Sequence, residues 1–258
     1  LNRIITWTKE GIEYEPDQRH AEIIIKQMGL DEGPNGVVTL GERKVAVEGT
    51  PVVEELIEDK SKNFRGIVAR ANYLSQDRSD IKFAVKELCR RMAKPTRRDW
   101  ERLIRLGKYL IGRERYITRF AFQGEVKVVA VWTDPDYAGC RDTRKSTSGG
   151  LILLGKHLIK TWSATQKVIA LSSGEAEYYG MVRGSAAGMG MRSMLRDLDV
   201  ETKIRVQEDS EAAKGIADRT GLGRVRHIEV SQLWVQEKVR SGDISARKVK
   251  GTENQATA

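Results

Sequence analysis

The spacing of apolar residues changes near residue 121, and no other feature of the sequence constrains the fold as strongly. Before this point apolar side chains recur every three or four residues, which is the spacing of an amphipathic helix. The clearest such series is Ile81, Ala84, Val85, Leu88 and Met92. After it, short β-branched runs such as residues 126–132 are typical of strands. The sequence therefore predicts a mainly helical region over residues 1–120 and an α/β domain over residues 121–258.

The order of elements in the α/β domain predicts a mixed sheet flanked by helices. Three strands come first, and a long helix, a strand, two helices and a last strand follow. The expected ranges are 126–132, 151–154, 157–162, 173–198, 203–207, 210–218, 228–239 and 244–249. In the first region we expect helices over residues 16–30, 79–94 and 99–112, with a poorly structured linker over residues 31–62. Leu1 stands in place of an initiator Met, so we expect a fragment or a processed product.

Positive charge is concentrated in the middle of the chain. Residues 60–120 contain 18 basic and 6 acidic side chains, whereas residues 1–59 contain 6 basic and 13 acidic ones. A basic helical stripe is typical of proteins that bind nucleic acid, because neutralising phosphates releases counterions. The expected contacts are Arg90, Arg91, Lys94, Arg97 and Arg98. An ordinary solvated helix face is the alternative interpretation.

Several classes of protein are excluded by composition. No run approaches the roughly 18 apolar residues of a membrane span, and no charged-then-apolar leader opens the chain. We therefore expect neither a membrane partner nor secretion. The two cysteines are too few for a disulfide framework or a cysteine-based zinc site, and no two of the three histidines are four residues apart. Any metal would have to bind carboxylates, which selects Mg²⁺ or Mn²⁺.

Four acids follow strands or open a helix in the expected α/β domain. Asp134 and Asp136 follow its first strand, Glu175 lies in the first turn of its long helix, and Asp209 follows its fourth strand. Carboxylates at such positions can converge above one edge of a sheet, where ligands bind in α/β folds. Two Mg²⁺ ions would neutralise a cluster of Asp134, Glu175 and Asp209 and would support displacement at a phosphodiester.

Each acid also has a purely structural interpretation. Asp209 is a suitable helix N-cap, Ser172 and Glu175 fit a capping box, and Asp134-Pro135-Asp136 would make a turn. Under this interpretation the chain would be an interaction protein whose acids only cap helices.

Four motifs in the α/β region together resemble the ribonuclease H domain of copia-type retrotransposon Pol polyproteins. They are Trp132-Thr-Asp-Pro-Asp-Tyr-Ala-Gly139, Asp142-Thr-Arg-Lys-Ser-Thr-Ser-Gly149, Ala170-Leu-Ser-Ser-Gly-Glu-Ala-Glu-Tyr178 and Arg226-His-Ile-Glu-Val230. Upstream, Phe64-Arg-Gly66 and Tyr109-Leu-Ile-Gly112 are similar to the end of the reverse transcriptase and its connection region. Nearly the whole chain is covered by this resemblance.

The resemblance implies a ribonuclease H-like fold and hydrolysis of the RNA strand of RNA–DNA hybrids. Asp134, Glu175 and Asp209 would be the catalytic acids and would hold two Mg²⁺ ions, with Mn²⁺ as a substitute. Asp136 would lie beside these ligands, and Glu177 would point away from them because it is two residues along the helix. The implied partners are an RNA–DNA hybrid and the rest of a Pol polyprotein, including the reverse transcriptase palm and integrase. The implied location is a cytoplasmic particle or the nucleus.

The chain also departs from the family pattern. The paired aspartates of the polymerase palm are absent, and Thr257 stands where the pattern has a fourth carboxylate. The terminal helix of the fold is missing as well. These departures favour weakened hydrolysis, or alternatively a decayed fragment that binds nucleic acid without cutting it.

The remaining candidate residues could contact phosphates or serve the structure. Arg141, Arg144, Lys145 and Ser146 lie between the first two strands and suit phosphate contacts, although a polar turn explains them as well. His227 could touch a phosphate, and a capping or packing role is the alternative. Gly180, Gly184 and Gly188 recur every four residues in the long helix, which predicts close packing against the sheet.

Overall fold

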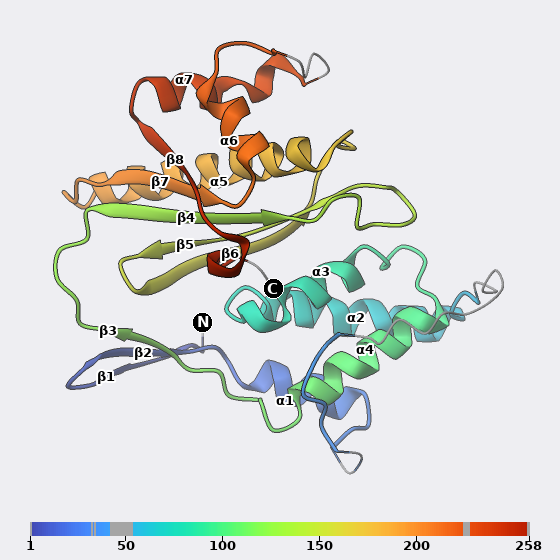
Figure 1. Ribbon diagram of the computed structural model, residues 1–258. Coiled ribbons are helices and arrows are strands. Elements are labelled where there is room, and N and C mark those ends of the chain that lie inside the picture. Colours follow the sequence, from blue (N-terminus) through green and yellow to red (C-terminus); the bar gives the residue numbers. More distant parts are fainter. Residues whose placement is uncertain (1, 32, 34, 42–53, 224–227, 257–258) are drawn as a thin grey trace. The chain divides into compact units, whose positions relative to one another are not determined.

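The computed structural model describes residues 2–31, 33, 35–41, 54–223 and 228–256. It divides into two compact units, Leu1–Ala121 and Phe122–Ala258. Figure 1 shows the course of the chain through both units. Each unit has its own apolar core, and each is described by itself below.

The N-terminal unit combines four α-helices with a small antiparallel sheet among its described residues. The strands are β1 (Ile4–Trp7), β2 (Gly11–Glu15) and β3 (Thr118–Ala121), in the order β1-β2-β3. The helices are α1 (Arg19–Gln27), α2 (Glu58–Leu74), α3 (Lys82–Cys89), which follows the short 3-10 helix η1 (Ser79–Ile81), and α4 (Arg97–Leu110). Their apolar faces pack around buried side chains such as Phe64, Ile67 and Leu103.

Two expectations for this unit are wrong. Helix α2 begins at Glu58, inside the segment expected to be a linker; the apolar piece at residues 45–47 lies outside the described residues. The three strands were not expected. Strands β1 and β2 form a local antiparallel hairpin, and β2 also pairs with β3 from more than 100 residues away. A glycine is required in this pairing, since a Cβ on Gly11 would lie 2.1 Å from the carbonyl oxygen of Phe120.

The C-terminal unit contains a five-stranded mixed sheet with the order β6-β5-β4-β7-β8. Its strands are β4 (Val128–Pro135), β5 (Thr147–Leu154), β6 (His157–Thr165), β7 (Lys203–Glu208) and β8 (Ile244–Lys248). Strand β5 is antiparallel to both β4 and β6, whereas β4, β7 and β8 run parallel. The carboxyl ends of β4 and β7 therefore meet at one edge of the sheet.

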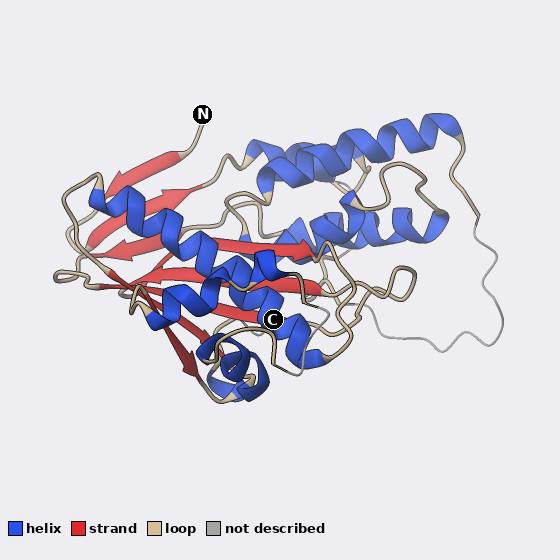
Figure 2. Cartoon of the chain, turned by 90° about the horizontal axis from the view of Figure 1, so that it is seen from above, coloured by secondary structure: helices blue, strands red, loops and turns tan. Residues whose placement is uncertain are grey.

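The helices of this unit are α5 (Ser173–Arg196), α6 (Glu211–Asp218) and α7 (Trp234–Arg240), with short 3-10 turns η2 (Val230–Gln232) and η3 (Gly251–Glu253). Helix α5 packs on β4 and β7, and α6 packs beside α5. Figure 2, seen from above, shows helices of this unit lying over the strands of its sheet. None of the helices in the described part of the chain combines the length and apolar character needed to cross a bilayer.

Strand β5 starts four residues earlier than expected, at Thr147-Ser148-Gly149-Gly150. Ser and Gly have low strand propensity, so the local sequence conceals this start. Pairing with β4 on one side and β6 on the other holds these residues in the sheet. Gly150 also leaves room for the Trp162 ring, because a Cβ at this position would lie 2.1 Å from that ring.

Candidate metal centre

Three carboxylates from different elements come together at the carboxyl edge of the sheet. Asp134 is near the end of β4, Asp209 directly follows β7, and Glu177 lies in the first turns of α5. One oxygen from each lies within 4.8 Å of the other two, and all three residues are half-buried. Because β4 and β7 are neighbouring parallel strands, their ends position Asp134 and Asp209 side by side.

The structure assigns the helix position of this cluster to Glu177, and the expectation that Glu177 points away is wrong. The side chain of Glu175 is buried and forms hydrogen bonds with residues near the start of α5. Its carboxylate accepts hydrogen bonds from the backbone N–H of Leu171 at 2.9 Å and from Tyr179 Oη at 2.8 Å. Glu175 is therefore not a member of the carboxylate cluster.

The face of α5 that packs on β4 explains why Glu177, and not Glu175, joins the cluster. A Cβ on Gly180 would lie 2.3 Å from Pro135 Cγ, and one on Gly184 would lie 2.6 Å from Thr133 Cγ2, so these glycines face β4. Glu177 is three residues before Gly180 and seven before Gly184, which places it on the same face of the helix. Glu175 is five residues before Gly180 and lies on another face. The glycine spacing was therefore the sequence signal that could have identified Glu177.

The structural interpretations of Asp134 and Asp209 do not hold. The N-cap of α6 is Ser210, whose hydroxyl accepts from the backbone N–H of Ala213 at 3.2 Å. Asp134 lies within β4, opposite Gly149 of β5, and not in a turn. Ser172 does cap α5, since its hydroxyl accepts from the backbone N–H of Glu175 at 3.2 Å.

The electrostatics of the cluster favour a bound cation. Burial, together with the negative charges of Asp209 and Asp134, raises the pKa of Glu177 to about 8. Glu177 Oε2 is buried and has no hydrogen-bond partner among the residues that the structure describes. Carboxylate oxygens are the ligands that Mg²⁺ and Mn²⁺ prefer, and a cation would offset both the repulsion and the missing partner. The residues present therefore fit a divalent cation.

The segment after β8 lies against the cluster. A Cβ on Gly251 would lie 3.1 Å from Asp209 Oδ2, so this turn approaches the Asp209 carboxylate closely. Asn254 is buried, and its amide Nδ2 donates to the carbonyl oxygen of Thr133 at 3.0 Å. Thr257 and His227 lie outside the described residues, so their expected roles stay predictions.

Asp136 and Ser146 hold the loop between β4 and β5. Asp136 Oδ1 accepts from the backbone N–H groups of Thr147 at 2.6 Å and Gly139 at 3.4 Å. Ser146 is fully buried, and its hydroxyl accepts from the backbone N–H of Ala138 at 3.0 Å. The expectation that Ser146 contacts phosphate is therefore wrong, because its side chain is enclosed by the loop.

The basic residues of the same loop are more accessible. Arg141 and Arg144 are exposed, and Lys145 is half-buried. Their contact with phosphate stays a prediction.

The basic residues expected to bind nucleic acid in the N-terminal unit lie between the end of α3 and the first turn of α4. Ion pairs among the described residues join Arg90 to Glu87 at 3.1 Å, Arg91 to Asp99 at 4.0 Å and Arg97 to Glu54 at 3.5 Å. Lys94 and Arg98 are exposed. A nucleic-acid contact by this set also stays a prediction.

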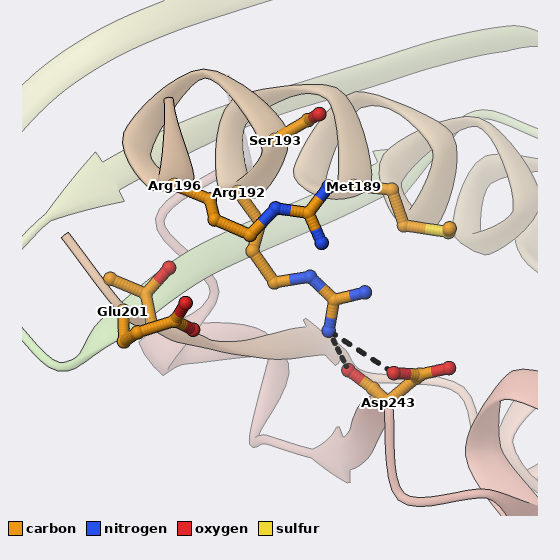
Figure 3. A pocket seen from close by; sticks show the side chains of 7 residues that line it. Met189, Arg192, Ser193, Arg196, Glu201 and Asp243 are labelled. Carbon is orange, nitrogen blue, oxygen red and sulfur yellow. Dashed lines mark hydrogen bonds and ion pairs between the residues drawn. The ribbon is translucent and has the colours of Figure 1, made fainter. Parts of the chain in front are cut away.

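A cavity of about 420 Å³ lies at the opposite end of α5 (Figure 3). Met189, Arg192, Arg196 and Asp243 contribute to its lining. Arg192 Nη1 donates to the carbonyl oxygen of Asp243 at 3.2 Å. Met189 is twelve residues beyond Glu177, or roughly 18 Å along the helix, so this cavity is separate from the carboxylate cluster.

Comparison with known proteins identifies the family. No family model matches the chain. It is 30% identical over 182 residues to the "Retrovirus-related Pol polyprotein from transposon RE2" of Arabidopsis thaliana, a match covering 69% of this chain and 12% of that protein. The chain belongs to the Pol polyproteins of copia-type retrotransposons. It spans about an eighth of the length of this relative.

Two solved structures are similar to this Pol-family chain. Ribonuclease H1 from the halophilic archaeon Halobacterium salinarum NRC-1 has a TM-score of 0.32 and 14% identity, covering 50% of this chain and 91% of that one. The foamy viral protease-reverse transcriptase in complex with RNA/DNA hybrid has a TM-score of 0.49 and 10% identity, covering 100% of this chain and 30% of that one. The family expected from the motifs is confirmed, and the mixed sheet flanked by helices is present as expected.

Proposed function

We propose that the C-terminal unit is a divalent-cation-dependent ribonuclease H that hydrolyses the RNA strand of RNA–DNA hybrids. A ribonuclease H-type domain is supported by the family and the fold. The observation that carries the proposal is the meeting of Asp134, Glu177 and Asp209 within 4.8 Å. Three carboxylates this close repel one another, and hydrolysis of a phosphodiester is a reaction for which such a cation site is suited.

In this proposal each residue of the cluster has a defined part. Asp134 and Asp209 hold cations from the ends of neighbouring strands, where the sheet keeps their separation constant. Glu177 closes the site from α5, and its burial makes the site favour an occupied state. When bound, the cations would polarise the scissile phosphate and lower the pKa of the attacking water. Water then adds to phosphorus as the P–O bond of the RNA strand breaks.

The remaining basic residues would place the hybrid. Arg141 and Arg144 on the loop after β4 would contact its phosphates near the cluster. The N-terminal unit, with Lys94 and Arg98 exposed, would act as a connection region that grips the duplex. We further propose that the chain is part of a Pol polyprotein that also contains a reverse transcriptase palm and an integrase, and that it acts in a cytoplasmic particle or the nucleus. The Pol polyprotein name of the relative supports the polyprotein context.

The test is cleavage of a labelled RNA–DNA hybrid in Mg²⁺ or Mn²⁺. We expect the wild type to cut the RNA strand, and Asp134→Asn and Glu177→Gln each to lower the rate by about 10²–10³-fold, as for loss of one electrostatic stabiliser. Glu175→Gln is the matched control on the same helix, and its rate should stay within about tenfold of wild type. Its stability should fall by about 1 kcal/mol, because Leu171 and Tyr179 lose part of their acceptor.

Two outcomes would contradict the proposal in different ways. Tight hybrid binding by the wild type without any cleavage would leave a nucleic-acid-binding module with no nuclease activity. Loss of cleavage in Glu175→Gln with normal cleavage in Glu177→Gln would return the catalytic role to Glu175.

A further inference from the structure

A fourth acid lies on the buried side of the carboxylate cluster. Glu208 is the last residue of β7 and directly precedes Asp209. Its side chain is 0% exposed, and within the described part of the chain neither carboxylate oxygen has a hydrogen-bond partner. Buried polar groups are nearly always paired, so a carboxylate with both oxygens unpaired calls for a missing ligand.

The side chain of Glu208 faces α5. Residues Ile204, Val206 and Glu208 alternate along β7 and are all buried, so they share one face of the sheet. A Cβ on Gly188 of α5 would lie 3.1 Å from Ile204 Cγ2, which shows that this face meets α5. Glu177 comes from the same side of α5, and its Oε2 also has no hydrogen-bond partner in residues 2–31, 33, 35–41, 54–223 and 228–256.

The register of the sheet places Glu208 beside a second buried oxygen. Trp132 of β4 pairs with Gln207 of β7 in a parallel ladder, so the next residues, Thr133 and Glu208, are neighbours on the two strands. Among the described residues, the buried hydroxyl of Thr133, the residue before Asp134, has no hydrogen-bond partner either. The unpaired oxygens of Glu177, Glu208 and Thr133 thus belong to elements that pack together where α5 covers β4 and β7.

We propose that Glu208 contributes a fourth carboxylate to the cation site of Asp134, Glu177 and Asp209, approaching it from the buried side. The cation supplies the partner that the two oxygens of Glu208 lack. This inference rests on the proposed function only in requiring that a divalent cation binds the cluster, and it does not depend on which nucleic acid is cut.

The experiment compares the intact wild-type chain with Glu208→Gln in EDTA and in Mn²⁺. In EDTA the melting temperature of Glu208→Gln should equal or exceed that of the wild type, because the amide has no charge to bury. In Mn²⁺ the wild type should gain more in melting temperature than the variant. Mn²⁺ affinity, measured by electron paramagnetic resonance of the free ion, should fall by roughly tenfold or more in Glu208→Gln.

Controls separate this inference from the proposed function. Glu237→Gln removes an exposed acid from α7 and should leave Mn²⁺ affinity unchanged, which controls for net charge. Glu177→Gln should weaken Mn²⁺ binding. Wild-type affinity in Glu208→Gln would overturn the role of Glu208 while leaving the cluster intact. Absence of Mn²⁺ binding by the wild type would instead overturn the cation site and the proposed function with it.

A second variant keeps the test valid if Glu208→Gln fails to fold. Glu208→Met places an apolar side chain of similar size at this buried position and should fold in EDTA with weakened Mn²⁺ binding. If neither variant folds, Glu208 serves the packing of β7 and the inference is wrong.

Discussion

Glu175 and Glu177 are two residues apart on α5, yet their carboxylates have opposite surroundings. Glu175 accepts hydrogen bonds from Leu171 and Tyr179 and thereby fastens the start of the helix. Glu177 has two carboxylates nearby and a buried oxygen for which the described residues provide no hydrogen-bond partner. The first residue is stabilised by the protein itself, whereas the second is stabilised only when a cation arrives. This contrast separates the structural acid from the candidate ligand.

Asp17 gives a pH-dependent prediction at the same scale. Arg19 donates to its carboxylate from Nε at 2.9 Å and from Nη2 at 2.6 Å, and these bonds lower the pKa of Asp17 to about 2. A lowered pKa means that the folded state favours the charged form, so this stabilisation is present above about pH 4 and is lost as the pH falls towards 2.

The measurement is the urea midpoint of wild type and Asp17→Asn between pH 6 and pH 2. Asp17→Asn should be less stable at pH 6, and the difference should shrink below pH 4. Asp31→Asn, at an exposed position, should match the wild type across the range. A difference for Asp17→Asn that stays constant with pH would show that the ion pair does not contribute.

At the scale of elements, the approach of α5 to the sheet depends on small side chains. Gly180, Gly184 and Gly188 each place the helix backbone close to side chains of β4 or β7. The close packing expected from their spacing is confirmed by these contacts. This approach also sets how far Glu177 reaches towards Asp134 and Asp209, so packing and site geometry are linked.

Gly184→Ala tests this link. Its Cβ would lie 2.6 Å from Thr133 Cγ2 and 3.1 Å from Val131 Cγ1, so we expect the free energy of unfolding to fall by about 1–3 kcal/mol, as for an overpacked core. Gly190→Ala is the control on the same helix, because nothing lies within 4 Å of its Cβ. It should raise the free energy of unfolding by up to about 1 kcal/mol through helix propensity. Equal effects in thermal or urea unfolding would rule out close packing at Gly184.

At the scale of the whole molecule, charge is unevenly distributed and partly used internally. The formal net charge is +9, and residues 60–120 carry most of the basic excess. Some of these residues stabilise the fold: Arg78 is 1% exposed, pairs with Asp80 at 2.7 Å and donates to the carbonyl oxygen of Arg113. A nucleic-acid contact is therefore expected from exposed positions such as Lys94 and Arg98, and not from the basic count as a whole.

A salt titration tests this expectation. The affinity for a labelled RNA–DNA hybrid, measured by fluorescence anisotropy, should fall steeply as salt rises. The double variant Lys94→Gln/Arg98→Gln should bind more weakly and should reduce the slope of log affinity against log salt by about 1–2, because fewer phosphates are neutralised. Lys9→Gln/Lys26→Gln makes the same change of charge at exposed positions outside the basic block. Equal losses in both double variants would contradict a specific contact by residues 60–120.

The sequence alone determined the family, the α/β class of the C-terminal unit and the positions of Asp134 and Asp209 at strand ends. It did so because these features are local: motifs, short apolar runs and a long helical period are readable in one stretch of chain. The same locality explains the failure at β3, which pairs with β2 through residues such as Gly11 and Ala121, whereas β1 and β2 form a local hairpin that was not expected from the sequence.

Only the tertiary structure decided which glutamate joins Asp134 and Asp209, and that Glu208 is buried without a hydrogen-bond partner among the described residues. A helix turns about 100° per residue, so Glu175 and Glu177 face different directions, and only packing on β4 determines which of them meets the aspartates. Burial of Glu208 likewise arises from α5 lying over the end of β7. The residues next to an acid in the sequence determine neither which side chains surround it nor whether it is buried from water, because both depend on segments distant in the chain.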